Sequence, residues 1–178
     1  IPSQLYKIDI AGGQPKKVLD LTAENARYNK NGDKIIYHDW KGYEDSWRKH
    51  HISSVTRDIW IYDTRKETYE QISDFEGEDR NPLFGNDDET VYYLSEKSGD
   101  FNVWKIKPGS SSSAEQLTHF EKHPVRFLSR ADNGLLCFGW HGEIYTLIEG
   151  SAPQKVNIEL SIDSRLVDEK ILPVSGGV

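Results

Sequence analysis

Four short stretches of the chain share one pattern, in which an aromatic residue lies at the centre of β-branched or aliphatic neighbours. Such a pattern suits a strand that is buried on both faces of a pleated sheet. The clearest copy is residues 58–63, with Trp60 at its centre, and the others are 102–107, 143–148 and, in weaker form, 5–9. The strong copies recur about every 40–45 residues, which is the repeat length of a β-propeller with four strands per blade.

The residues around these strands predict the other strands of each unit. Two β-prone runs, joined by a polar turn rich in Gly, Asn and Asp, come before each aromatic strand, and a polar strand follows it. We therefore expect an all-β chain that forms an incomplete β-propeller, with three four-stranded antiparallel blades and one half-blade. The expected units are a half-blade over 1–21, blades over 22–75, 76–119 and 120–160, and a connector or tail over 161–178.

The expected half-blade has two strands, 5–10 and 16–21, and the first full blade then begins with a separate short strand over 25–29. Three and a half units are too few to close a propeller. We therefore expect exposed apolar faces at both ends of the array. Missing blades or a second copy of the chain would cover them.

A long insertion over 39–57 replaces the short turn that the other units use between their second and third strands. Loops of this length in a compact β fold are often functional. One interpretation is that its aromatic residues only pin the loop onto a neighbouring blade. The other is that the loop binds a peptide or a partner protein, because Trp and Arg are common anchors at interfaces. The candidate binding residues are Trp47, Arg48, His50 and His51 of the loop, together with Arg80.

The run 76–81 contains three acidic residues before Arg80 and Asn81. We expect it to be a solvated connection between two blades, in which Glu78 or Asp79 holds Arg80. Calcium would need several oxygens that converge from one rigid turn, and the pattern does not favour it.

Composition and motifs exclude several classes of function. A formal net charge of −7 and a pI near 5.4 argue against nucleic-acid binding. Cys137 is the only cysteine, so no internal disulfide is expected, and no apolar run reaches the roughly 20 residues that span a bilayer. The chain begins at Ile1 and contains no methionine, so we expect it to be a piece of a longer product.

Candidate chemistry is sparse. Adjacent residues of a strand point to opposite faces, so His50 and His51 do not predict a metal site. No Gly-x-Ser-x-Gly elbow or Gly-rich phosphate loop is present. We expect no catalytic residue, no metal and no cofactor in this chain.

Several longer motifs resemble one family. They are 41–44, 47–51, 53–60, 77–82, 92–96 and 123–128. The repeats resemble those of TolB and the tricorn protease, and over about residues 1–160 the chain looks like the propeller of bacterial tricorn-like serine proteases. The resemblance implies a non-catalytic propeller that gates or docks peptide substrates or supports assembly, ahead of a PDZ domain and a serine protease domain. It also implies a periplasmic or secreted protein.

Two other functions remain open on the sequence. The chain could be a free-standing protein-binding propeller like TolB, or the propeller lid of a prolyl-oligopeptidase-like hydrolase. The expected partners are a peptide or protein substrate of the parent protease and either the missing blades or a second copy of the chain. Nucleic acid and a membrane span are not expected.

Overall fold

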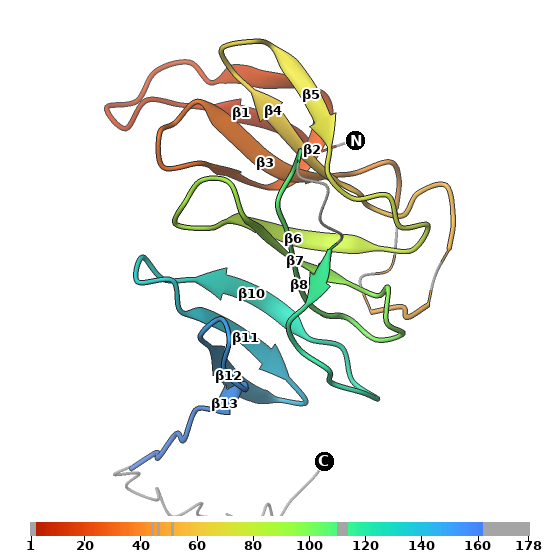
Figure 1. The fold of residues 1–178 in the computed structure, drawn as a ribbon. Helices are drawn as coiled ribbons and strands as arrows, with labels where there is room; N and C mark the ends of the chain where they lie inside the picture. Colours follow the sequence, from red (N-terminus) through yellow and green to blue (C-terminus); the bar gives the residue numbers. More distant parts are fainter. Residues whose placement is uncertain (1–2, 44, 46, 51, 110–113, 162–178) are drawn as a thin grey trace, which may run out of the picture.

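The computed structural model describes residues 3–43, 45, 47–50, 52–109 and 114–161, and every regular element within them is a β-strand (Figure 1). The strands form three antiparallel sheets of five, four and four strands, each in chain order. The first sheet contains β1 (Gln4–Lys7), β2 (Lys16–Tyr28), β3 (Lys34–Asp39), β4 (Ile59–Asp63) and β5 (Thr68–Gln71). The second contains β6 (Asp79–Phe84), β7 (Val91–Ser95), β8 (Asn102–Ile106) and β9 (Glu115–Gln116). The third contains β10 (Arg126–Arg130), β11 (Leu136–Trp140), β12 (Glu143–Leu147) and β13 (Gln154–Lys155).

The second sheet lies between the other two, so the sheets follow one another in the order of the chain (Figure 1). Strand β6 contacts β2 of the first sheet and β10 of the third. These three strands, β2, β6 and β10, are called the inner strands below. The inner strands of the three sheets lie side by side, as in neighbouring blades of a propeller. The predicted all-β fold is therefore confirmed.

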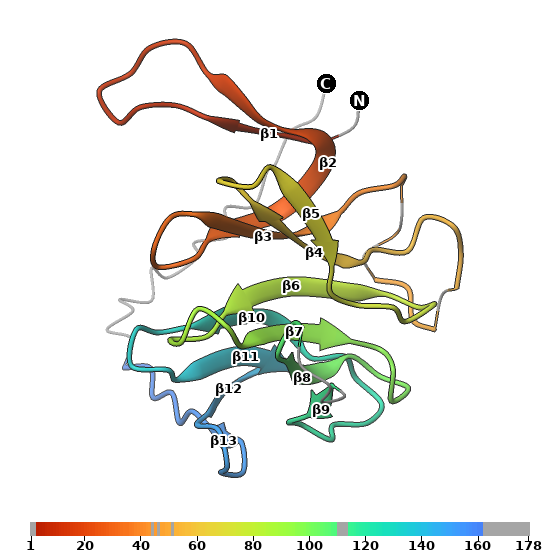
Figure 2. The ribbon, with the colours of Figure 1, turned by 45° about the horizontal axis from the view of Figure 1, so that its top comes forward.

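The prediction of separate strands over 16–21 and 25–29 is wrong, because β2 runs without a break from Lys16 to Tyr28. Its first part pairs with β1 and its second part with β3. Between these parts, the Ala23 N–H donates to the Ser3 carbonyl at 3.3 Å and the Thr22 hydroxyl donates to the Trp40 carbonyl at 2.7 Å. No Gly or Pro interrupts the segment, so the chain stays extended while it changes partners. Figure 2 shows the resulting β1–β2 hairpin projecting away from the rest of the described chain.

Apolar side chains fill the spaces between the sheets. The core between the first and second sheets includes Ile36, Ile59, Val91 and Tyr93, and the core between the second and third includes Val103, Val125, Leu136 and Phe138. Each such side chain contributes roughly 1.5–3 kcal/mol by leaving water. The aromatic strand pattern is therefore the pattern of strands that face a core on each side. It is complete in β8, where Val103 and Trp104 are both buried.

One irregularity is repeated in all three inner strands. The pairing register shifts between Glu24 and Arg27 in β2, between Arg80 and Leu83 in β6, and between Arg126 and Ser129 in β10. The residue that begins each shift has a left-handed backbone: φ is 51° at Asn25, 52° at Asn81 and 58° at Phe127. Such bulges bend a strand and turn its side chains in a new direction. Here they set the direction of the residues just before them, Glu24, Arg80 and Arg126.

The acidic run is not the solvated connection that we expected. Glu78 is 2% exposed, Asp79 is 1% exposed and Arg80 is 8% exposed. Strand β6 already begins at Asp79, and the Asp79 N–H donates to the Arg57 carbonyl at 3.0 Å. The charged side chains are buried because Arg57 and Arg80 lie beside Glu78, which the order of residues along the chain did not reveal.

Large apolar side chains are exposed at both ends of the array. In the β1–β2 hairpin they include Tyr6, Ile8 and Leu21, and in and after the third sheet they include Ile144 and Ile148. None of the described residues belongs to a helix that is long and apolar enough to cross a membrane.

Candidate functional site

A cavity of about 240 Å³ lies where the three inner strands meet. Its wall combines charged and aromatic residues from all three sheets, and the long loop contributes Trp47 and Arg57. The residues that line it include Glu24, Asn25, His38, Trp47, Arg57, Arg80, Asn81, Phe101, Arg126 and Phe127. We call it the inner-strand pocket.

The repeated bulge places one charged residue from each inner strand at this pocket. Glu24, Arg80 and Arg126 stand at the same position of three successive repeats, immediately before the left-handed residue. Because the inner strands neighbour one another, these three side chains line one surface. The inner strands therefore supply one carboxylate and two guanidinium groups to the pocket, and Arg57 adds a third guanidinium group.

Glu78 links Arg57, at the end of the long loop, to Arg80 of β6. Its Oε1 accepts from Arg57 at 2.6 Å and from Arg80 Nε at 2.6 Å. Burial by itself would raise the pKa of Glu78, but the hydrogen bonds and charges of Arg80 and Arg57 outweigh it and lower that pKa. Arg80 also lies over the Phe101 ring, with its Cζ 5.0 Å from the ring centroid. The position of Arg80 is therefore fixed by two contacts, one ionic and one aromatic.

His38 lies on the other side of this network and is 3% exposed. Its Nδ1 accepts from the Asn81 N–H at 3.2 Å, and its Nε2 is 3.6 Å from Glu24 Oε2. Burial lowers the pKa of His38, which favours a neutral ring. Because Nδ1 accepts from the Asn81 N–H, the proton of the neutral ring lies on Nε2. The contact with His38, followed by those with Ser3 and Arg57, lowers the pKa of Glu24 to about 2.

The long loop crosses from the first sheet over the second to the third. The His50 N–H donates to Glu96 Oε2 at 2.9 Å. Lys49 Nζ donates to Asp100 Oδ1 at 2.8 Å and also to the carbonyl of Lys122. Arg126 of β10 lies over the Trp47 ring, with its Cζ 4.5 Å from the ring centroid. The loop is therefore pinned onto two neighbouring sheets, and Trp47 comes to lie beside the inner-strand pocket.

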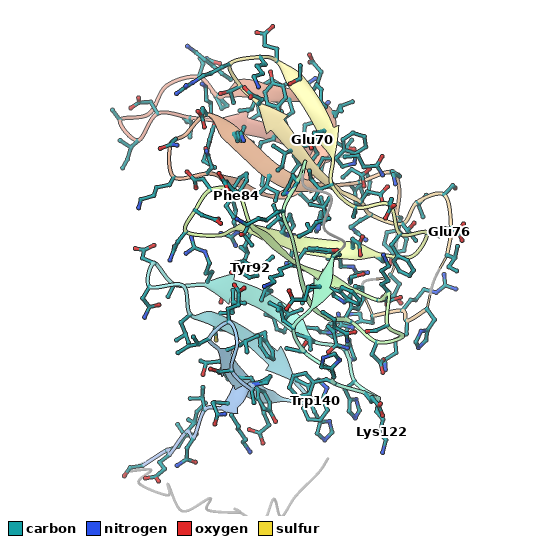
Figure 3. All side chains as sticks on the ribbon, in the orientation of Figure 1. Glu70, Glu76, Phe84, Tyr92, Lys122 and Trp140 are labelled. Atoms are coloured by element: carbon teal, nitrogen blue, oxygen red, sulfur yellow. The ribbon has the colours of Figure 1, made fainter. Side chains whose placement is uncertain are left out.

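A second hollow, of about 510 Å³, lies beside the same two residues. Trp47 and Arg126 line both hollows, and Phe127, which is 74% exposed, also lines both. The far wall of the second hollow comes from the end of the third sheet, where Trp140 Nε1 donates to the His123 carbonyl at 2.9 Å. Figure 3 shows Trp140 and Lys122 at this same end of the molecule. We call this second hollow the outer groove.

Basic groups and aromatic rings dominate the outer groove. His123 stacks on His141 with 4.2 Å between ring centroids, and Lys49 and Arg126 line the same hollow. Glu143 is the one acidic residue among the described residues that line it. The groove is therefore more basic than a protein with a net charge of −7 would suggest. Among the described residues, no group of three His, Cys, Asp or Glu side chains could hold a metal ion.

The structure separates the predicted site residues. Trp47 and Arg80 both line the inner-strand pocket, whereas Arg48 and His50 are exposed in the loop. His51 lies outside the described residues. The prediction that Glu78 or Asp79 holds Arg80 is confirmed for Glu78, which accepts a hydrogen bond from Arg80 Nε.

Sequence reasoning missed most of the pocket, namely Glu24, His38, Arg57, Arg126 and Phe127. One signal could have found part of it. When the three inner strands are aligned on their bulges, Glu24, Arg80 and Arg126 fall in one column of the repeat.

Comparisons with known proteins give the same fold. The family described as Tricorn protease N-terminal beta propeller domain matches residues 2–152. The Tol-Pal system protein TolB of Helicobacter pylori is 37% identical over 62 residues, which cover 35% of this chain and 15% of that protein.

Solved structures extend the likeness over most of the chain. The crystal structure of the tricorn protease has a TM-score of 0.70 and 18% identity over 90% of this chain and 15% of its own. TolB from Acinetobacter baumannii has a TM-score of 0.58 and 12% identity over 85% of this chain and 34% of its own. A puromycin-hydrolyzing peptidase of Mycobacterium tuberculosis has a TM-score of 0.58 and 11% identity over 79% of this chain and 22% of its own. At these identities, the structures share the fold. The chain spans only a small part of each of these proteins.

Proposed function

The chain belongs to the family of tricorn protease N-terminal β-propeller domains, and from this premise we propose that it docks peptide substrates for a tricorn-like serine protease without cleaving them. The observation that carries this proposal is the Trp47–Arg126 pair, which stands between the inner-strand pocket and the outer groove. A peptide that lies across this pair would reach both hollows.

The chemistry of the two hollows suits a peptide. An exposed aromatic ring beside an arginine offers a flat apolar contact and a cation at one place, and such residues dominate binding energy at many interfaces. The basic lining of the outer groove favours peptides that carry carboxylates, because a charge of opposite sign gains most where water is partly excluded. The left-handed backbone at Phe127 is a costly position for a large side chain, and such strain is common at binding sites.

The parent protein in this proposal contains the catalytic domain elsewhere in its sequence, and its location is periplasmic or secreted. Both parts rest on the family. A second candidate is a free-standing propeller that binds another protein, as the TolB likeness suggests. It differs from the first in its ligand, which would be a folded partner and not an extended peptide.

Titration of the 178-residue chain with short peptides tests the proposal. One set pairs acidic with aromatic residues, and a second set replaces each acid with lysine. We expect the acidic set to bind and Trp47→Ala to weaken its binding about tenfold, which corresponds to roughly 1.4 kcal/mol. Tyr43→Ala is the matched control, because Tyr43 lies in the same loop and is 86% exposed. Equal binding of both sets, or an equal effect of both substitutions, would contradict peptide docking at this pair.

A further inference from the structure

A hollow of about 570 Å³ lies at the opposite end of the inner strands from the inner-strand pocket. It is lined by the last residues of all three strands, Tyr28, Phe84 and Arg130, and by the turns that follow them. These turns lie on one side of the molecule (Figure 2). We call this third hollow the turn-side hollow.

Neutral acceptors hold Arg130 in place at this hollow. Its Nε donates to the Phe84 carbonyl at 2.8 Å, and its Nη1 donates to the Ala131 carbonyl at 3.0 Å and also to Asn86 Oδ1. Among the described residues, no acceptor binds its Nη2 and no carboxylate forms an ion pair with it. The guanidinium group is therefore oriented and partly exposed, and its charge has no direct counterion. Such a group is well suited to bind an oxyanion.

Two further cations line the turn-side hollow. Arg27 lies near the end of β2, and Lys30 lies in the turn that follows. Both residues are exposed, and neither side chain has an ion-pair partner within the described part of the chain. Cations from the first and third sheets therefore line the same hollow.

Two carboxylates also line the turn-side hollow, and main-chain donors engage one of them. Asp88 accepts from the Lys30 N–H at 2.9 Å and from the Asn31 N–H at 3.3 Å, so it joins the turns of two neighbouring sheets. Asp132 is exposed in the turn after β10. Three cations and two carboxylates leave one positive charge at this hollow, although the protein has a net charge of −7.

Apolar surface lies beside these charges. The Tyr28 residue is 50% exposed, and Leu83 and Phe84 also line the hollow. A bare anion such as chloride would fill little of a volume of about 570 Å³. An organic anion with an aromatic or aliphatic body would contact both the cations and the apolar wall.

We propose that the turn-side hollow binds an organic carboxylate, with Arg130 as its principal donor, Arg27 and Lys30 as the surrounding cations and the Tyr28 ring against the apolar part of the ligand. One carboxylate balances the one remaining positive charge. Two sources carry this chemistry, a free organic acid and the acidic side chain of a peptide. The site is separate from the pair that carries the proposed function and does not depend on that function.

Calorimetric titration of the 178-residue chain at pH 7 with sodium phenylacetate tests the site, with sodium chloride at matched ionic strength as the blank. We expect phenylacetate to bind the wild type and to bind Arg130→Gln about tenfold more weakly. Arg65→Gln is the matched control, because its side chain is 74% exposed and does not line the hollow.

A second variant separates binding from folding, because Arg130 also joins the second and third sheets. Arg27→Gln leaves those hydrogen bonds intact and should weaken phenylacetate binding about threefold. Wild-type heats no larger than the sodium chloride blank, or equal affinities of the wild type and both variants, would overturn the proposal.

Two further arms locate the ligand and identify its source. Trp47→Ala should bind phenylacetate as the wild type does. Loss of binding in Trp47→Ala, with none in Arg130→Gln, would move the ligand to the site of the proposed function and overturn this one. Nα-acetyl-glutamic acid α-amide that binds as tightly as phenylacetate identifies an acidic peptide side chain as a ligand, whereas binding of phenylacetate alone identifies a free organic acid.

Discussion

The guanidinium group of Arg126 lies over the indole ring of Trp47, with 4.5 Å between Cζ and the ring centroid. This contact joins a loop that leaves the first sheet to the inner strand of the third sheet. The loop therefore connects two sheets that are not neighbours in the array. Because Trp47 and Arg126 line both the inner-strand pocket and the outer groove, a change in the position of the loop would change the shape of both hollows.

Loss of this contact should loosen the loop without unfolding the protein. A cation–π contact at an exposed site is worth roughly 0.5–1 kcal/mol, so Trp47→Ala should increase the open population of the loop about two- to fivefold. We expect trypsin to cleave after Arg48 or Lys49 faster by that factor, with the urea midpoint nearly unchanged. Tyr43→Ala should leave the cleavage rate as it is. Identical rates for the wild type and Trp47→Ala would show that the hydrogen bonds of Lys49 and His50 hold the loop by themselves.

The Glu78 carboxylate should be essential for stability. Glu78→Gln keeps the shape of the side chain but leaves Arg57 and Arg80 buried without their shared anion, and loss of one partner from a buried pair costs roughly 3–5 kcal/mol. That is a large part of the 5–15 kcal/mol that stabilises a typical domain. Urea unfolding measures the loss, and Glu76→Gln at an exposed neighbouring position is the control. A similar small cost for both variants would contradict the prediction that the two arginines need this anion.

Asp79 should make the protein less stable as the pH rises. Burial raises its pKa from the ordinary value of 3.8 to about 7 in the folded chain, so the folded state holds the proton more tightly. Its contribution is complete below pH 4 and is lost as the pH rises towards 7, with roughly 4 kcal/mol as an upper limit. Asp79→Asn should match the wild type near pH 4 and exceed it by a few kcal/mol at pH 8. Urea unfolding at both pH values checks this, and a constant difference between the two proteins would refute the raised pKa.

Phe127 should matter for binding and little for stability. Its φ of 58° is costly for a large side chain, and the residue is 74% exposed, so Phe127→Asn relieves backbone strain and removes little buried surface. We expect a change in unfolding free energy below about 1 kcal/mol, together with weaker binding of acidic peptides. Phe138→Asn is the contrasting variant, because Phe138 is 1% exposed in the core and its loss should cost several kcal/mol. Strong destabilisation by Phe127→Asn would place this residue in the fold and not in the groove.

The fold could be predicted because its signals are local. An aromatic strand can be recognised from six consecutive residues, and turns such as Asn31-Gly32 lie between the strands that they join. Each unit can therefore be predicted without knowledge of its long-range contacts. The continuity of β2 escaped prediction for the opposite reason. Whether the chain stays extended at Thr22 and Ala23 depends on Ser3 and on Trp40, which are distant in sequence.

The sequence by itself determined the all-β repeat array, the position of the long loop and the presence of Trp47 and Arg80 in the candidate site. Only the tertiary structure decided which charges are buried and what they meet. The run 76–81 looks solvated because its composition is polar, yet Glu78 and Asp79 are buried, and Glu78 has two arginines beside it. Burial and pairing depend on the residues that pack from other sheets. Arg126 meets Trp47 across 79 positions of sequence, a contact that no local pattern of hydrophobic and polar residues can specify.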